Sequence, residues 1–192
     1  MSDCAASMAT LRYVVDPRLS RFTVQAFAGG FLAGFAHSPT FAIRGISAEA
    51  RLDPQDLGSA SVRMEIQAHS LQLLDQLSDH DHREIERVMR EEALETAAYP
   101  TIAFQSTRVT ASQAADGQHN LTLEGNLSLH GVTRQFSMPT RLAFTGDMMR
   151  AFGNFSLKQT DFKIKLVKVA GGAIKVKDDL KFSFDLVARR EE

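Results

Sequence analysis

The chain has 192 residues, of which 44% are apolar and 23% are charged, which is the composition of a globular domain with a sizeable core. A formal net charge of -1 argues against the overall basic field that nucleic-acid-binding proteins use, and we expect no nucleic-acid partner. One cysteine, Cys4, excludes a disulfide framework within the chain.

The first segment of the chain carries no recognisable targeting signal. Residues 1–10 lack both a basic region and an apolar run, so we expect a flexible N-terminus without a secretory signal peptide. Nor does any stretch reach the roughly 18 apolar residues that a membrane span requires. The expectation is a cytoplasmic protein whose residues 11–190 form a single domain.

The first half of the chain predicts several short strands. Residues 12–16 are an opening strand that ends at a proline turn, and residues 22–27 alternate between apolar and polar side chains. Gly45 stands where the apolar alternation changes phase, between Ile43 and Ile46, which predicts a β-bulge. Strict alternation over 62–69 predicts a further half-buried strand.

One segment has helical rather than strand periodicity. Ile85, Val88 and Met89 are spaced as on one face of a helix, and the helix is predicted over about 81–95. Asp81 followed by Glu84 predicts a capping box at its start. The helix ends before Pro100, because the residue that precedes a proline avoids helical backbone.

The second half of the chain is dominated by apolar residues at every second position, as in Leu121, Leu123 and Leu127. Tight turns are predicted at Gly131 and Gly146. The expected strands are 101–109, 118–130, 132–144, 148–158, 160–169 and 173–188. Many antiparallel strands with one inserted helix predict an all-β, closed or nearly closed barrel, since closure hides the strand edges.

The histidines are the first candidates for chemistry. His69, His119 and His130 fall on the polar positions of their strands and are predicted to lie at the surface. His80 and His82 could contribute to a metal site, but a solvated helix cap is the favoured interpretation.

His37 lies in a turn between apolar strands and is a candidate polar anchor at a barrel rim. Its neighbour Ser38 does not make a catalytic pair with it, because adjacent residues on extended backbone point apart. The sequence has no nucleophile elbow and no zinc-protease motif. We therefore expect no catalytic residues, no metal site and no enzymatic activity.

Charge is unevenly distributed along the chain. Every lysine lies between Lys158 and Lys181, whereas acidic residues dominate 75–95. The lysines could attract an anionic head group or a membrane surface, but a solvated strand face that protects an edge is favoured. The basic and acidic segments could also meet across a dimer.

Several segments together resemble the YceI-like family of lipocalin-like, isoprenoid-binding domains. The opening strand (13–16) followed by Ser-Arg-Phe (20–22), and the His37 turn that leads to Phe41, resemble the family's first strands. Residues 99–106 (YPTIAFQS), residues 125–134 (GNLSLHGVTR) and the stretch from Phe155 to Ile164 with its DFKI element resemble later family motifs. The resemblance extends over about residues 12–188.

This resemblance implies an elongated antiparallel lipocalin-like β-barrel of about eight strands with one α-helix. It also implies a non-enzymatic protein that carries or sequesters a polyisoprenoid, an isoprenoid quinone or a similar amphiphilic lipid. A homodimer is expected, as is transient contact with a membrane, and no cofactor is expected beyond the bound lipid.

The expected ligand-binding residues are the apolar side chains on the inward positions of the strands, with His37 as the polar anchor and Arg44 as a second candidate for that role. The complete set is Phe22, Val24, His37, Ile43, Met64, Ile66, Phe104, Leu123, Leu127, Phe136, Leu142, Phe155, Phe162, Phe182 and Phe184. Two alternatives remain: a filled barrel that acts as an interaction module, and a metal-binding protein or enzyme that uses His37, His80 and His82.

Overall fold

The computed structural model describes residues 10–29, 38–169 and 174–191. Long antiparallel strands make up most of these residues, and one α-helix continues into a π-helical turn. The elements are β1 (Leu11–Val15), β2 (Arg21–Gln25), β3 (Ala28–Gly29), β4 (Thr40–Ile43), β5 (Ile46–Asp53), β6 (Asp56–Gln67), η2 (Ala68–Ser70), β7 (Leu71–Leu73), α1 (Asp79–Val88), η3 (Met89–Ala93), β8 (Thr101–Ala115), β9 (Gln118–Leu129), β10 (Val132–Thr145), β11 (Met148–Lys158), η4 (Gln159–Phe162), β12 (Lys168–Val169), β13 (Ile174–Val176) and β14 (Asp179–Glu191).

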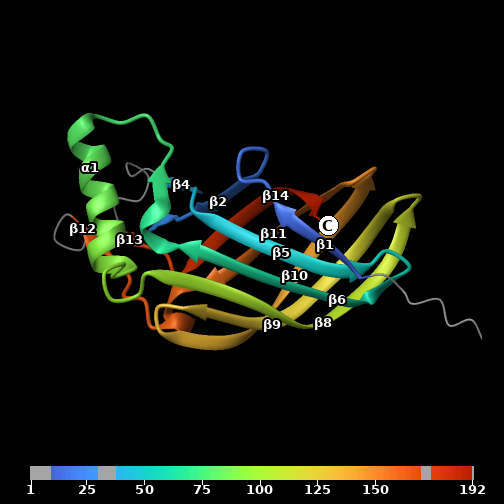
Figure 1. The fold of residues 1–192 in the computed structure, drawn as a ribbon. Coiled ribbons are helices and arrows are strands. Elements are labelled where there is room, and N and C mark those ends of the chain that lie inside the picture. The colour runs from blue at the N-terminus through green and yellow to red at the C-terminus, as the bar shows by residue number, and fades with distance from the viewer. Residues whose placement is uncertain (1–9, 30–37, 170–173, 192) are drawn as a thin grey trace, which may run out of the picture.

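The strands close into an elongated eight-stranded barrel (Figure 1). Their order around the wall is β1, β5, β6, β8, β9, β10, β11 and β14, and β14 returns to pair with β1, where Val15 lies opposite Ala188. The helix α1 stands at one end of the barrel, and Figure 1 shows β12 and β13, which form a small sheet with β3, at that same end. The predicted all-β barrel with one inserted helix is confirmed.

Three positions in the wall are each occupied by two strands that follow one another in the chain. The C-terminal half of β14 pairs with β1 and its N-terminal half with β2, where Phe22 lies opposite Phe184. In the same way β4 lies beside β2 while β5 lies beside β1, and β7 continues the line of β6 along β4. The wall is therefore interrupted at three neighbouring positions.

The interruption between β4 and β5 lies at Gly45, so the change of phase marks a break between two strands and not the predicted β-bulge within one strand. Ile43 and Ile46 are both buried although two residues separate them, so the inward-facing positions shift by one across the break. The Gly45 N–H donates to Ser70 Oγ at 2.8 Å, and a Cβ atom at Gly45 would approach Ser70 to 2.9 Å. Only a residue without a side chain fits this contact.

The predicted strand 160–169 is wrong, and the predicted strand 173–188 is divided. Residues 159–162 form the 3-10 helix η4, and regular pairing resumes only at β12 and β13 before the long β14. Asp178 holds η4 in place: its carboxylate accepts from the Thr160 N–H at 2.9 Å and from the Thr160 hydroxyl at 2.7 Å. These hydrogen bonds lower the pKa of Asp178. Hydrogen bonds to a side chain from a distant part of the sequence have replaced strand pairing here.

The helix α1 begins earlier than predicted. Its N-cap is Ser78, whose Oγ accepts from the Asp81 N–H at 3.2 Å and donates to the Asp81 carboxylate at 2.7 Å. The predicted capping box of Asp81 and Glu84 is therefore wrong, because the serine three residues before Asp81 supplies the oxygen that caps the helix.

Two side chains of α1 protect the edge of the strand β7. The Leu73 N–H donates to the Glu86 carboxylate at 3.0 Å, and His82 Nε2 lies 3.3 Å from the Leu73 carbonyl oxygen. Both polar groups of an edge residue are thereby occupied, which removes them as a template for pairing with another chain.

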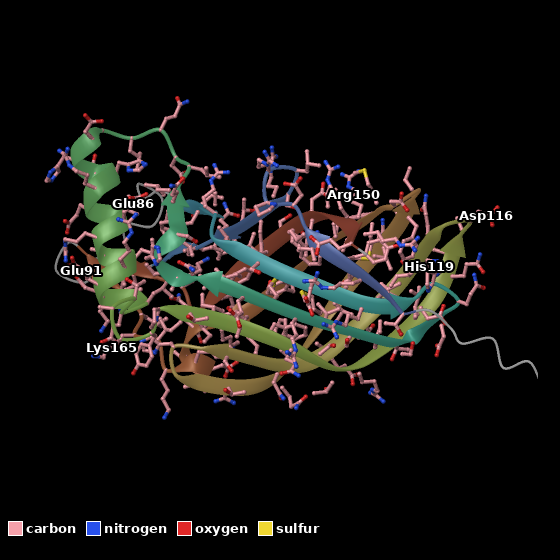
Figure 2. All side chains as sticks on the ribbon, in the orientation of Figure 1. Glu86, Glu91, Asp116, His119, Arg150 and Lys165 are labelled. Carbon is pink, nitrogen blue, oxygen red and sulfur yellow. The ribbon has the colours of Figure 1, made fainter. Side chains whose placement is uncertain are left out.

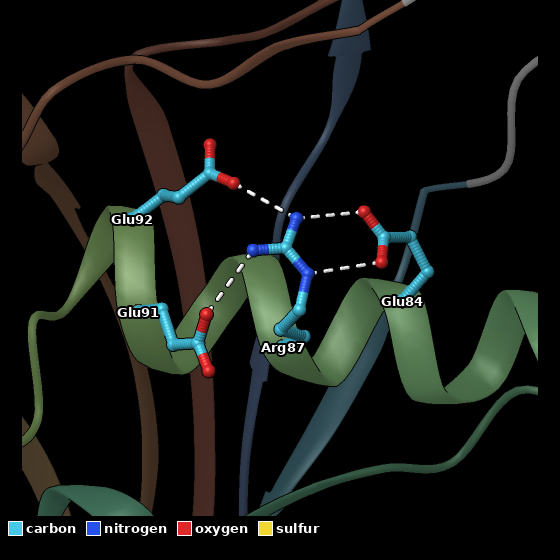
Figure 3. Close-up of polar contacts among 4 residues, drawn as sticks. All are labelled: Glu84, Arg87, Glu91 and Glu92. Atoms are coloured by element: carbon cyan, nitrogen blue, oxygen red, sulfur yellow. Dashed lines mark hydrogen bonds and ion pairs between the residues drawn. The ribbon is translucent and has the colours of Figure 1, made fainter.

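The outer face of the helix carries a cluster of ion pairs (Figure 3). Arg87 donates to both carboxylate oxygens of Glu84, at 2.7 and 3.0 Å, and also to Glu91 and Glu92. The hydrogen bonds from Arg87 lower the pKa of Glu84, and those to the three carboxylates raise the pKa of Arg87. Because these groups are exposed, their contribution to stability is small.

The acidic helix and part of the lysine-rich segment lie at the same end of the barrel. Figure 2 shows Glu86, Glu91 and Lys165 there, with Asp116 and His119 at the opposite end.

His130 is buried, which corrects its predicted position at the surface. His130 and Gly131 both have positive φ, 50° and 71°, as in a tight hairpin turn, so alternation no longer predicts where the His130 side chain points. Its Nε2 lies 2.8 Å from the Glu95 carboxylate and its Nδ1 lies 3.2 Å from the Phe162 carbonyl oxygen. The ring of Tyr99 packs 4.2 Å away between ring centroids. His130 thus joins the chain after the helix to the β9–β10 turn and to η4.

We predict that His130→Ala lowers the free energy of unfolding by about 2 kcal/mol, because it removes a buried ring and leaves one of its hydrogen-bond partners, the Phe162 carbonyl or the Glu95 carboxylate, without a donor. Urea denaturation of this variant and of the exposed control His69→Ala measures the difference. Equal effects of the two substitutions would contradict a structural role for His130.

Candidate ligand cavity

The barrel encloses a cavity of about 80 Å³. Leu52 and Leu57 flank the β5–β6 turn and Met149 follows the β10–β11 turn, which places the cavity in the half of the barrel away from α1. The lining comprises Tyr13, Val15, Phe22, Ala48, Glu49, Ala50, Leu52, Leu57, Ala60, Val62, Met64, Phe104, Leu121, Leu123, Met138, Thr140, Leu142, Met149, Ala151, Phe184, Leu186 and Ala188.

The surface of the cavity is almost entirely apolar. Thr140, one of its few polar residues, donates its hydroxyl to the Met138 carbonyl oxygen at 3.3 Å. Glu49 borders the cavity, but its carboxylate is bound by Arg12, whose hydrogen bond at 3.0 Å lowers the pKa of Glu49. The interior therefore suits a hydrocarbon, which has no hydrogen bonds to satisfy.

Six of the residues expected to bind ligand line this cavity. They come from β2, β6, β8, β9, β10 and β14, so strands from around the whole wall converge on it. The six are Phe22, Met64, Phe104, Leu123, Leu142 and Phe184.

The other expected residues lie outside the lining. Val24, Ile43, Ile66, Leu127 and Phe162 are buried in the core. Phe136, Phe155 and Phe182 are partly buried and pack against that core. His37 lies outside the described residues.

A cluster of phenylalanine rings adjoins the cavity. Phe155 stacks on Phe182 with ring centroids 4.7 Å apart and lies 5.1 Å from Phe136. Phe22 lies 6.2 Å from Phe182 and 6.0 Å from Phe184, within the range of favourable aromatic contacts. Since Phe22 and Phe184 also line the cavity, the apolar interior continues from the cavity into this cluster.

Glycines on the inner wall make room for two of the large rings. A Cβ atom at Gly125 would approach Phe104 Cζ to 2.8 Å, and one at Gly153 would approach Phe184 Cζ to 2.9 Å. Each ring thus packs directly over glycine backbone, which explains why these strands interrupt their apolar alternation with glycine.

Sequence reasoning did not select several lining residues, both large ones such as Leu121 and Met138 and a set of small ones. Ala48, Ala50, Ala60, Ala151 and Ala188 line the cavity, and their small size leaves the space that larger side chains would fill. Ala48 and Ala50 are on the inward positions of their strand, so alternation identifies their side of the wall. Selection of large apolar residues passes over them.

The part of the chain that the structure describes contains no group of three or more His, Cys, Asp or Glu side chains arranged to hold a metal ion. His80 is exposed. In those same residues no helix is both long and apolar enough to cross a membrane.

The closed antiparallel barrel with one helix and an apolar interior has the architecture of the lipocalin-like class. The YceI-like domain family matches residues 13–188, and the chain belongs to this family. A comparison with curated proteins gave no match.

Solved structures share the fold at low sequence identity. BcnA of Burkholderia cenocepacia is 20% identical with a TM-score of 0.67, over 90% of this chain and 98% of that one. A polyisoprenoid-binding domain from Saccharophagus degradans, implicated in plant cell wall breakdown, is 13% identical with a TM-score of 0.65, over 93% and 98% of the two chains. The YCEI protein of Campylobacter jejuni is 14% identical with a TM-score of 0.57, over 78% and 83%.

We predict that the cavity is dry and binds xenon, because apolar cavities exclude water and accept apolar guests. Xenon should shift the NMR signals of lining methyl groups such as those of Leu123 and Met138. The variant Ala48→Phe should abolish these shifts, and the exposed control Ala111→Phe should leave them unchanged. Shifts that persist in Ala48→Phe would contradict the assigned cavity.

Proposed function

We propose that this protein binds a polyisoprenoid, an isoprenoid quinone or a similar long apolar lipid, and carries or sequesters it without catalysis. The observation that carries the proposal is the apolar interior, which runs from the cavity through Phe22 into the phenylalanine cluster. Burial of hydrocarbon stabilises a complex by about 25 cal/mol per Å². The Saccharophagus domain of the same fold is described as polyisoprenoid-binding, which supports this ligand class.

A long lipid needs more space than the cavity provides in this structure. The cavity of about 80 Å³ is much smaller than the about 300–1,000 Å³ of typical ligand pockets. Three methionines, Met64, Met138 and Met149, lie in its lining, and their unbranched side chains change shape at little cost. We propose that these residues and Phe22 reorient to admit the chain of the lipid.

The small volume also favours a second candidate function. A barrel filled by its own side chains could serve as an interaction module, with the acidic helix and the lysine-rich segment as its contact surfaces. This candidate predicts that no lipid accompanies the purified protein.

We further propose that the protein works in the cytoplasm as a homodimer and meets membranes briefly to exchange its lipid. The lysines between Lys158 and Lys181 support contact with anionic lipid surfaces. Light scattering on the purified protein measures the oligomeric state, and cell fractionation measures the location.

The test of the main proposal is organic extraction of the natively purified protein followed by mass spectrometry. We expect a prenyl lipid at near one equivalent per chain in the wild type, and a loss of at least about fivefold in Ala48→Phe, because the added ring occupies the cavity. The control Ala111→Phe should retain the lipid. An extract without lipid, together with failure to take up added prenyl lipid, would contradict lipid binding and favour the interaction module.

A further inference from the structure

The neighbouring strands β10 and β11 are paired along only part of their length. The ladder between them contains five residue pairs next to the turn that joins them, and it ends where Arg141 lies opposite Phe152. By contrast, β10 pairs with β9 over 12 residues and β11 pairs with β14 over 11. The remaining stretch, between residues 132–140 of β10 and 153–158 of β11, is held by no ladder, and we call it the β10–β11 seam.

A proline explains where this ladder ends. The Pro139 carbonyl oxygen faces β11, since a Cβ atom at Gly153 would approach it to 2.6 Å. The N–H and C=O of one strand residue point to the same neighbouring strand, so the Pro139 nitrogen also faces β11, where it has no hydrogen to donate. The register of Arg141 and Phe152, continued by two residues, brings Pro139 opposite Asn154. A missing donor at this position accounts for the loss of pairing beyond it.

At its other end the seam is closed by side chains instead of a ladder. Arg134 Nε donates to the Asp161 carbonyl oxygen, and His130 Nδ1, in the turn before β10, lies 3.2 Å from the Phe162 carbonyl oxygen. Both carbonyl groups belong to η4, which directly follows β11. Arg134 is exposed, so water can replace its contact, and such a contact opens more easily than a ladder of backbone hydrogen bonds.

The seam lies beside the phenylalanine cluster. Phe136 of β10 and Phe155 of β11 are on inward positions next to it, with ring centroids 5.1 Å apart, and both are only partly buried. Phe155 in turn lies 6.3 Å from Phe22 and 6.2 Å from Phe184, two residues that line the cavity. An apolar path therefore leads from the seam through the cluster to the cavity.

The ladder between β6 and β8 is equally short, but other contacts close the wall beyond it. Its five pairs end where Arg63 lies opposite Gln105. The next residue of β6, Val62, donates its N–H to Ser106 Oγ at 2.8 Å, and Val109 further along β8 is buried. Partly exposed aromatic rings border the β10–β11 seam instead, which favours that seam as an opening.

We propose that the β10–β11 seam is a gate through which an apolar guest crosses the barrel wall between Phe136 and Phe155. This inference rests on the proposed function and adds the route by which its site is loaded. The short ladder beside the β10–β11 turn is the hinge, and the contacts of Arg134 and His130 with η4 hold the gate closed. Opening the seam breaks no ladder pair, whereas passage between β9 and β10 would break a continuous ladder of backbone hydrogen bonds.

A disulfide across the seam tests the gate. The register continued along the seam brings Ser137 opposite Ser156, and both are exposed. The variant combines Ser137→Cys and Ser156→Cys with Cys4→Ser, which removes the one natural cysteine. Stopped-flow fluorescence follows association of the apolar fluorophore N-phenyl-1-naphthylamine. We expect oxidation to slow association at least about tenfold and dithiothreitol to restore the rate, with the equilibrium affinity unchanged.

The matched control places the disulfide inside the ladder. Thr145 lies opposite Met148 beside the turn, and both are exposed. Thr145→Cys combined with Met148→Cys and Cys4→Ser links the same two strands where they are already paired. The association rate of this control should be the same with the disulfide oxidised and reduced.

A second variant opens the gate instead of locking it. Arg134→Ala removes the side-chain contact with η4 and should raise both the association and the dissociation rate of N-phenyl-1-naphthylamine about threefold, because the closed state loses a contact. The equilibrium affinity should stay the same, since the bound and free states keep their lining. Arg141→Ala, which replaces an exposed arginine in the paired part of β10, should change neither rate.

The results that would overturn the gate differ from those that would reject the proposed function. Equal association rates with the seam disulfide oxidised and reduced, or unchanged rates in Arg134→Ala, would reject the gate while apolar binding stands. Equal slowing by the seam disulfide and the control disulfide would also reject it, because the effect would then come from stiffening of the hairpin. Failure of the wild type to bind N-phenyl-1-naphthylamine and geranylgeraniol at equilibrium would reject the proposed function as well.

Discussion

The pairing of β14 with both β1 and β2 is the constraint on which this structure depends. A single strand of 13 residues holds the first strand of the chain at one end and the second at the other, and so closes the wall. Closure removes the strand edges that would otherwise template aggregation. It also fixes the register, and a slip of one residue would turn the apolar face of β14 outward. The inward position of Phe184 and Ala188, and with it the cavity, follows from this register.

Within the closed wall, the sizes of the inward residues decide which part of the barrel is filled. Towards α1 the interior holds large side chains such as Phe162, which is 2% exposed. In the other half, alanines occupy inward positions of four strands, β5, β6, β11 and β14, and the space between them stays open. Phe22 and Phe184 stand between the two regions and contact both. The interior is thus graded along its length, with a packed core at one end and an adaptable apolar space at the other.

The sequence predicted the inside and the outside of the wall well, but not the position of a residue along the barrel axis. Alternation over β9 places Leu123 and Leu127 on the same inner face, yet only Leu123 reaches the cavity, because strand tilt and length decide that distance. Where the backbone leaves the extended region, alternation fails, as it does for His130 in its turn. Hydrogen bonds that the Asp178 carboxylate accepts from Thr160 likewise replace a predicted strand by η4, and alternation could not predict them because the two residues are far apart in the sequence.

The breaks in the wall bring charged side chains next to the apolar interior, which a continuous wall of paired strands would keep apart. Paired strands satisfy their own backbone groups and present alternating faces, so polar groups are separated from the interior throughout the ladder. At Gly45 the ladder is interrupted beside the interruption at Ser20, and Arg21 and Arg44 lie next to side chains that line the cavity. The same glycine that shifts the inward face of the chain, and so keeps both Ile43 and Ile46 buried, also places a guanidinium group at the wall.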